Sequence, residues 1–272
     1  MLKLKLFLNN ENVLYIIMFR SISKQHALIT GGSRGIGATI ADTLAKNGIR
    51  VTILSQNENL LKSRVQELNE KYPMNEERKH DYIAYNLTTS NKIEESIREK
   101  YWNQFKDINI LINCAGKTQK NLLMCTASNE INDVISVNLT SPIVLSKLFI
   151  KNAIRMKDIT HPFILINIAS IVAKSDKDID LIGASIYTTS KAGLVRFTES
   201  IKKELEYMGK RKSGGIAEQM SQTGIHVLLP GFVADTAIGE SVKVGEGYSI
   251  PETSREEIAE DVLAIVKEAN HV

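Results

Sequence analysis

The sequence predicts an α/β protein with a single, doubly wound parallel sheet between two layers of helices, the Rossmann-like arrangement. Short apolar runs alternate with stretches of helical periodicity over most of the 272 residues, which is typical of βαβ units and a parallel sheet. A glycine-rich turn at 31–37 directly follows the first apolar run. No Gly-, Ser- or Pro-rich linker and no internal repeat interrupts the alternation, so we expect residues 25–272 to form one domain.

Six short apolar runs are the predicted strands: 26–30, 51–54, 82–85, 108–112, 163–169 and 225–229. In an open sheet of this kind, ligands bind at the carboxyl ends of the strands. Each motif described below lies at such an end or on the helix beside it.

The segments between the strands carry apolar residues three or four positions apart, the spacing of a helix that covers a sheet. The first such helix spans about 36–44 and is closed by Asn47-Gly48. Ser254 and Glu257 fit a capping box that opens the last helix. The helices expected between these two are 61–72, 93–105, 129–157 and 185–207.

Composition excludes several classes of protein. Hydrophobic residues make up 43% and charged residues 24% of the chain, which is the range of a globular protein rather than a disordered or fibrous one. Cys114 and Cys125 form no CxxC pair and cannot build a disulfide framework. The histidines are scattered along the sequence, so we expect no metal site.

The positive charge lies at the amino end. Residues 1–24 carry four basic side chains and one acidic one, so the remaining basic and acidic residues balance and predict no nucleic-acid face. A basic, acid-poor leader is typical of a transit peptide, so we expect a mitochondrial matrix protein. The alternatives are a disordered terminus or an extra strand, a start at Met18, and a cytoplasmic location. The apolar run 13–19 is too short to span a bilayer, and no membrane span is expected.

The glycine-rich turn reads TGGSRGIG over 30–37 and separates the first strand from the first helix. Glycines allow the backbone to approach a pyrophosphate, and the helix N-terminus offers unpaired N–H groups to it. The spacing is GxxxGxG, and no GK[ST] follows, so the turn is not a Walker A loop. The alternative is a tight turn without a ligand.

A second motif is Tyr187-Thr188-Thr189-Ser190-Lys191. Residues four apart share a helix face, and a lysine ammonium one turn away is expected to lower the pKa of the tyrosine. Ser170 ends a long apolar strand and faces the same crevice. Each motif has an alternative interpretation when it is taken alone. A tyrosine and a lysine four positions apart often occur by chance, and a serine at a strand end is often a simple turn residue.

These motifs together resemble the short-chain dehydrogenase/reductase family over about residues 25–237. The match rests on TGGSRGIG, INCAG at 112–116, VNLT at 137–140, Ser170, YTTSK at 187–191 and Pro230-Gly231. The resemblance implies that Tyr187 donates a proton to a carbonyl oxygen and that Ser170 holds that carbonyl. It also implies that Lys191 binds ribose hydroxyls and that Asn138 binds a water of the proton relay, unless Asn138 only satisfies backbone groups at a helix kink.

The resemblance also implies a nicotinamide cofactor. Strand two ends in Ser55-Gln56-Asn57 without the acid that would bind the ribose 2′-hydroxyl of NAD, and Arg34 stands where a 2′-phosphate is bound. We therefore expect NADPH, with Arg34 as a solvated loop charge the alternative; Asn113 is alternatively a structural strand cap. The implied cofactor-binding residues are Gly31, Ser33, Arg34, Gly35, Ile36, Gly37, Ser55, Asn86, Leu87, Asn113, Ala115, Gly116, Tyr187, Lys191, Pro230, Gly231, Val233 and Thr236.

Within the family, the motifs are most similar to reductases of 3-oxoacyl groups on acyl carrier protein, which implies that acidic carrier as partner. Lys203 matches a basic position that contacts the carrier, and Lys202, Lys210, Arg211 and Lys212 extend the patch unless they are a solvated helix end. The alternatives are a reductase of free small carbonyls or steroids, and a non-catalytic NADPH-binding subunit.

The sequence departs from the family's pattern in five places. Residues 174–183 lengthen the segment between Ser170 and Tyr187, and 209–223 form a longer loop. Asn86 replaces an aspartate that contacts adenine, and Asp235 displaces the usual threonine to Thr236. The chain ends soon after the last helix, so we expect the family's final strand to be missing. We expect a homo-oligomer. The resemblance implies that the final strand helps to build a tetramer, so its absence leaves the number of subunits open.

Overall fold

The computed structural model describes residues 24–75, 78–155, 161–174, 182–211, 223–236, 238–239 and 250–270. The expected leader, apart from Lys24, lies outside these residues. So do most of the insertion before Tyr187, most of the loop 209–223, and Lys212. Nothing below concerns their structure.

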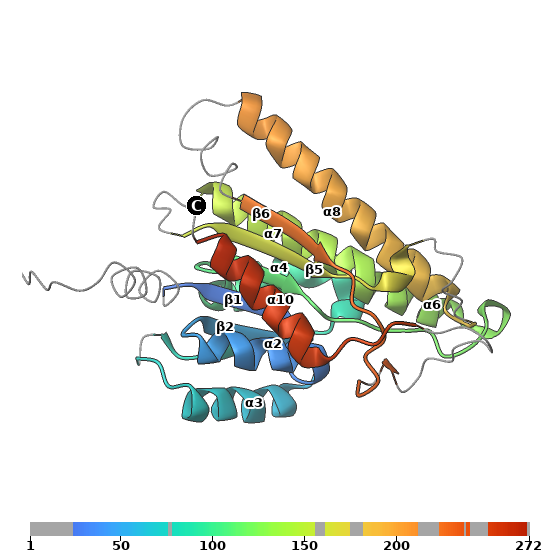
Figure 1. Ribbon diagram of the computed structural model, residues 1–272, viewed down its shortest axis with the longest axis horizontal. Coiled ribbons are helices and arrows are strands. Elements are labelled where there is room, and N and C mark those ends of the chain that lie inside the picture. The colour runs from blue at the N-terminus through green and yellow to red at the C-terminus, as the bar shows by residue number, and fades with distance from the viewer. Residues whose placement is uncertain are drawn as a thin grey trace, which may run out of the picture.

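Six parallel strands form one sheet in the order β3-β2-β1-β4-β5-β6 (Figure 1). The strands are β1 (His26–Thr30), β2 (Arg50–Ser55), β3 (Asp81–Ala84), β4 (Ile110–Asn113), β5 (Phe163–Ile168) and β6 (Thr223–Leu228). The prediction of six parallel strands is confirmed, with ends displaced by one or two residues. The chain progresses outward in both directions from β1 and β4, so a crevice forms where their following loops diverge.

Helices cover both faces of the sheet, which confirms the three-layer prediction (Figure 1). One layer holds α2 (Gly35–Lys46), α3 (Glu58–Lys71) and α10 (Arg255–Glu268). The other holds α4 (Ile93–Lys100), α5 (Trp102–Phe105), α6 (Ser128–Ile135), α7 (Ser141–Arg155) and α8 (Ser185–Arg211). Short 3-10 turns lie at η2 (Leu87–Lys92), η3 (Leu123–Cys125) and η5 (Ile171–Ala173).

The central strands β1, β4 and β5 are mostly apolar because both of their faces are buried. In β4, Ile110 and Ile112 belong to the core beneath α2 and α10, whereas Leu111 belongs to the core beneath α4 and α7. Successive side chains of a strand point to opposite faces, so each run supplies two cores at once. The expected capping box between Ser254 and Glu257 is present at the start of α10.

Two helical regions of the prediction are divided in the structure. The stretch 93–105 was predicted as one helix but divides at Tyr101, whose hydroxyl donates to the carbonyl of Ala84 at 2.8 Å. The stretch 129–157 divides into α6 and α7 around a π-helical turn, η4 (Ser136–Thr140). A π turn widens the helix locally, and here it contains the fully buried Asn138.

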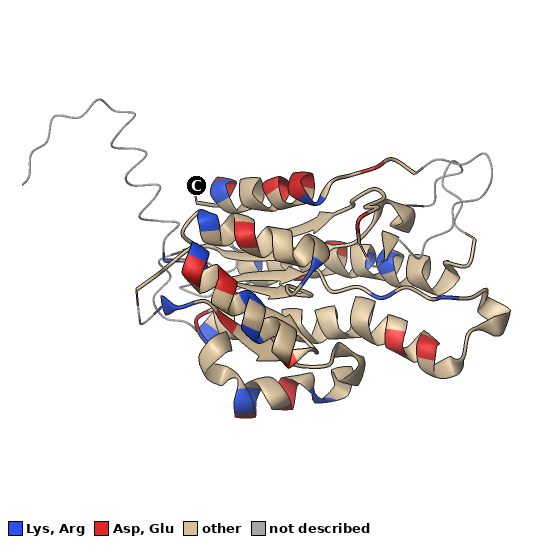
Figure 2. Cartoon of the chain, turned by 90° about the horizontal axis from the view of Figure 1, so that it is seen from below, with Lys and Arg blue, Asp and Glu red and all other residues tan. Residues whose placement is uncertain are grey.

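The continuous stretch Ser128–Arg155 is long and apolar enough, by length and composition, to cross a bilayer. Half of its most apolar window is buried inside the protein, and α7 packs Leu145, Leu148 and Phe149 into the core. A core helix passes the same test. Lys, Arg, Asp and Glu are mixed over the outer helices in Figure 2.

Candidate active site

A cavity of about 820 Å³ opens at the carboxyl ends of the central strands. Its wall is built from the loops that follow β1, β2, β3, β4, β5 and β6, together with one face of α8. Of the residues that the sequence assigns to catalysis or cofactor binding, all but Asn113 and Asn138 line it. The topology therefore gathers into one cavity side chains that are up to about two hundred positions apart.

The glycine turn forms the floor of the cavity. Gly31 and Gly35 have φ of +70° and +56°, values that strongly favour glycine. A Cβ on Gly37 would lie 2.4 Å from the carbonyl oxygen of Gly31, so the turn and the first turn of α2 are in close contact. The residue before α2, Arg34, makes no capping hydrogen bond with its side chain, and the first turn of α2 has no acidic residue. The exposed N–H groups and the helix dipole thus suit an anionic group such as a pyrophosphate.

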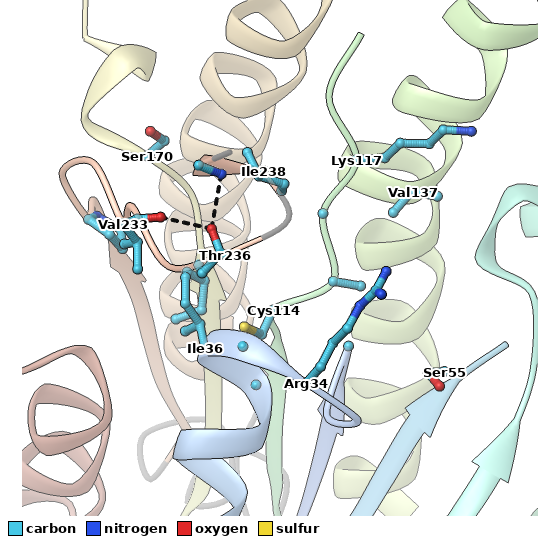
Figure 3. Close-up of a pocket in the computed structure, with 18 of the residues that line it drawn as sticks. Arg34, Ile36, Ser55, Cys114, Lys117, Val137, Ser170, Val233, Thr236 and Ile238 are labelled. Carbon is cyan, nitrogen blue, oxygen red and sulfur yellow. Dashed lines mark hydrogen bonds between the residues drawn. The ribbon is translucent and has the colours of Figure 1, made fainter. Parts of the chain in front are cut away.

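Arg34 and Ser55 lie at one side of the cavity (Figure 3). The Arg34 side chain extends from the glycine turn into the cavity and forms no ion pair with any residue that the structure describes. The Ser55 hydroxyl is buried and has no hydrogen-bond partner among the described residues. An available guanidinium and an unpaired hydroxyl fit a ribose that bears a phosphate. The residues on this side of the cavity are therefore compatible with the expected NADPH.

Ser170, Tyr187 and Lys191 form a second group of polar residues in the same cavity. The Ser170 hydroxyl is close enough to Tyr187 to favour its ionised form. The Nζ of Lys191 donates to the carbonyl of Ile168 at 2.8 Å and lies 5.9 Å from the centroid of the Tyr187 ring. All three side chains are buried, with exposed fractions of 8%, 8% and 3%.

The pKa values of this group are set mainly by burial. Burial raises the pKa of Tyr187, and the nearby Ser170 hydroxyl only partly opposes this rise. The expectation that Lys191 would lower the pKa of Tyr187 is therefore wrong for this structure, because desolvation of the phenolate outweighs the favourable contacts. Burial lowers the pKa of Lys191 to about 8. At neutral pH the phenol consequently holds its proton, and the lysine remains mostly charged.

Asn138 and Asn113 lie behind the cavity wall. The Nδ2 of Asn138 donates to the carbonyl of Lys117 at 2.8 Å and to the Ser190 hydroxyl at 2.9 Å, and its Oδ1 accepts from the Lys117 N–H at 2.8 Å. The Nδ2 of Asn113 donates to Asn167 and Ser146 inside the protein, as in the structural alternative, and its contact with the cofactor stays a prediction. Both asparagines are thus engaged in tying elements together, since parallel strands and helices converge there.

The remaining predicted residues are placed as follows. Asn86 lines the cavity while its Oδ1 accepts from the Thr88 N–H at 3.0 Å. Asp235 and Thr236 both line it; Asp235 pairs with Arg255, and Thr236 donates to the Val233 carbonyl at 2.9 Å (Figure 3). On α8, Lys202, Lys203 and Lys210 are exposed, with Glu204 and Glu206 between them.

Sequence reasoning assigned no role to Thr30. Its hydroxyl accepts from the N–H groups of both Cys114 and Ala115 at 3.0 Å, which ties the end of β1 to the loop after β4. The only signal in the sequence is a threonine at a strand end directly before the glycines. Cys114 also lines the cavity, but burial raises the pKa of its thiol to about 12, so it is not a thiolate nucleophile.

The chain is similar in sequence to known proteins. The family model for short chain dehydrogenase matches residues 25–243. The 3-oxoacyl-[acyl-carrier-protein] reductase FabG of Escherichia coli (strain K12) is 34% identical over 207 residues, covering 76% of this chain and 72% of that protein. Carbonyl reductase family member 4 of Xenopus laevis is 28% identical over 242 residues, covering 88% and 89% of the two chains.

Solved structures share the fold. A metagenomic short-chain oxidoreductase in complex with NADP superposes with a TM-score of 0.68 at 24% identity, covering 93% of this chain and 95% of that chain. The 3-oxoacyl-[acyl-carrier protein] reductase of Brucella melitensis in complex with NAD gives a TM-score of 0.69 at 17% identity, with 90% coverage of each chain.

Proposed function

The chain belongs to the short-chain dehydrogenase family, and from that premise we propose that it is an NADPH-dependent reductase of 3-oxoacyl groups carried by acyl carrier protein. The observation that carries the reductase chemistry is the buried group of Ser170, Tyr187 and Lys191 on the wall of a dinucleotide-sized cavity. The carrier-bound substrate is supported by the name of the Escherichia coli relative.

The chain's own residues supply the acid and the orientation. NADPH supplies the hydride when it is bound. Ser170 and Tyr187 together hold the carbonyl oxygen of the substrate, because both hydroxyl-bearing side chains line the same cavity. Tyr187 then donates its phenolic proton to that oxygen, and its raised pKa keeps the proton available at neutral pH. The Lys191 ammonium, which is fixed by its hydrogen bond to the Ile168 carbonyl, would hold the ribose hydroxyls of the cofactor.

Turnover by purified protein tests the proposed substrate. Oxidation of NADPH is followed at 340 nm with acetoacetyl-carrier protein, with the same acyl group on a short thiol, and with free ketones. A higher kcat/KM for the carrier-bound substrate is expected. Activity on free carbonyls alone would favour the second candidate, a carbonyl reductase, which the name of the Xenopus relative supports. NADPH binding without any turnover would point to the non-catalytic subunit.

Arg34 is expected to select the phosphorylated cofactor. Replacing Arg34 with Ala should weaken NADPH binding about 10- to 100-fold, because a charged hydrogen bond to phosphate is lost. NADH has no 2′-phosphate, so its affinity should change less than about twofold. Fluorescence titration of both cofactors provides the measurement, with NADH as the internal control. Equal losses for the two cofactors would show that Arg34 does not contact the 2′-phosphate.

The pKa of Lys191 predicts an alkaline limit to activity. Because burial lowers this pKa to about 8, the ammonium loses its proton as the pH rises through that value. We expect kcat/KM to be level between about pH 6 and 7.5 and to decrease above about pH 8. In Lys191→Arg the side chain at this position stays charged at alkaline pH. The kcat/KM of this variant should therefore not decrease above about pH 8. A wild-type profile that stays level to pH 10 would contradict the prediction.

We also propose that the protein acts in the mitochondrial matrix, supported by the basic composition of residues 1–24. A fusion of these residues to a fluorescent protein should enter mitochondria. A diffuse cytoplasmic signal would contradict this part of the proposal.

We also propose that the protein forms a homo-oligomer. Light scattering of the purified protein measures its mass in solution and tests this proposal.

A further inference from the structure

Helix α8 begins only two residues before Tyr187, and its first turn lacks an acceptor of its own. The residue before the helix is Ala184, which has no polar side chain, and the first turn contains no acidic residue. The first N–H groups of a helix have no partner within the helix and need one from elsewhere. Where they find none, the terminal turn frays, and Tyr187 would move with it.

Gln119, on the segment that follows β4, supplies this acceptor. Its Oε1 accepts from the N–H of Ile186 at 2.6 Å and, at 3.4 Å, from the N–H of Tyr187 itself. Its Nε2 donates to the carbonyl of Asn121 at 3.0 Å and to the Ser185 hydroxyl at 3.4 Å. The side chain is 3% exposed, so water does not compete for these bonds.

The backbone of Tyr187 is also held at its carbonyl group. The carbonyl of Tyr187 accepts from the Ser190 hydroxyl at 2.7 Å, and that hydroxyl accepts from Asn138. Asn138 also fixes both backbone groups of Lys117, two residues before Gln119. A closed set of hydrogen bonds therefore connects the loop after β4, the π turn and the backbone of Tyr187.

We propose that Gln119 is a positioning residue that sets where the Tyr187 hydroxyl meets the substrate carbonyl. This proposal rests on the proposed role of Tyr187 as proton donor. Gln119 lies outside the lining of the cavity, so it acts through the backbone of α8 rather than on the substrate. A misplacement of about 1 Å at a reacting group costs up to about 100-fold in rate.

Two substitutions of similar length separate the acceptor from the volume. Gln119→Met keeps an unbranched side chain but removes the strong acceptor, and kcat should fall about 10- to 100-fold. The KM and Kd for NADPH should stay within about twofold, because the glycine turn and Arg34 are unaltered. Gln119→Glu keeps an acceptor at a helix N-terminus, where a negative charge is favourable, but loses the donor to the Asn121 carbonyl. Its kcat should therefore lie clearly above that of Gln119→Met, within about tenfold of the wild type.

Hydrogen exchange provides a readout that needs no substrate. In Gln119→Met, amides of the peptide 182–190 should exchange faster, while those of 194–205 on the same helix stay unchanged. A wild-type kcat in Gln119→Met, or unchanged exchange at 182–190, would overturn the positioning role. A Tyr187→Phe variant with wild-type kcat would instead refute the proposed function, and that result is distinct because the exchange data do not depend on turnover.

Discussion

Replacing Tyr187 with Phe should lower kcat about 1,000-fold, within the range that a positioned acid contributes. The substitution removes one oxygen from a ring that is 8% exposed and leaves the packing of α8 intact. Ser170 keeps its hydroxyl, but a serine hydroxyl is a far weaker acid than a phenol. NADPH should still bind, since the glycine turn, Arg34 and Lys191 are unchanged.

The measurement combines the steady-state rate of NADPH oxidation at 340 nm with fluorescence titration of the cofactor. Tyr207→Phe serves as the matched control, because Tyr207 lies on the same helix but is 56% exposed, and its kcat should equal that of the wild type. A Tyr187→Phe enzyme with more than about a tenth of wild-type kcat would assign the proton to another donor. Loss of NADPH binding in that variant would show that Tyr187 mainly holds the cofactor.

Replacing Asn138 with Ala should cost about 3 kcal/mol of unfolding free energy, because it leaves the backbone groups of Lys117 without their partner. For a chain of this size the melting temperature should fall by roughly 6–12 °C. We expect kcat to fall as well, since the loop from Lys117 to Gln119 loses its anchor. Urea denaturation and calorimetry provide the measurement.

Asn103→Ala is the control for this prediction, because Asn103 is exposed and, among the described residues, its side chain only accepts a hydrogen bond from Lys106 at 3.3 Å. Its stability should change by less than about 0.5 kcal/mol. If Asn138→Ala kept full stability and lost only turnover, the structural role would be refuted. The water-relay role that the family resemblance implies would then explain Asn138.

Much of the fold was predictable because it depends on local pattern. The strands β1, β4 and β5 are mostly apolar and fully buried, which is typical of a parallel sheet covered on both faces. The glycine turn was predictable because residues with positive φ and close backbone contacts leave a glycine signature, as at Gly31 and Gly35. The cavity then followed from the rule that ligands bind at the carboxyl ends of the strands.

Other features depend on residues far apart in the sequence, and local pattern does not reveal them. The hydrogen-bond partners of Asn138 lie 21 and 52 positions away, so only the assembled fold shows that its side chain is fully engaged. The pKa of Tyr187 was predicted from a lysine one turn away, whereas burial by the whole fold decides its direction. Asn113 ends β4, and the sequence does not show that its amide group bonds to Asn167, 54 positions away.

The π turn between α6 and α7 makes this region intolerant of changes in chain length. An ordinary helix advances about 100° per residue, so deleting any one residue of Ser136–Thr140 would rotate one flanking helix by that angle relative to the other. Either Val134 of α6 or Leu145 and Phe149 of α7 would then turn away from the core that they now fill. Length variation among related chains should therefore accumulate in the surface loops and be absent from these five residues.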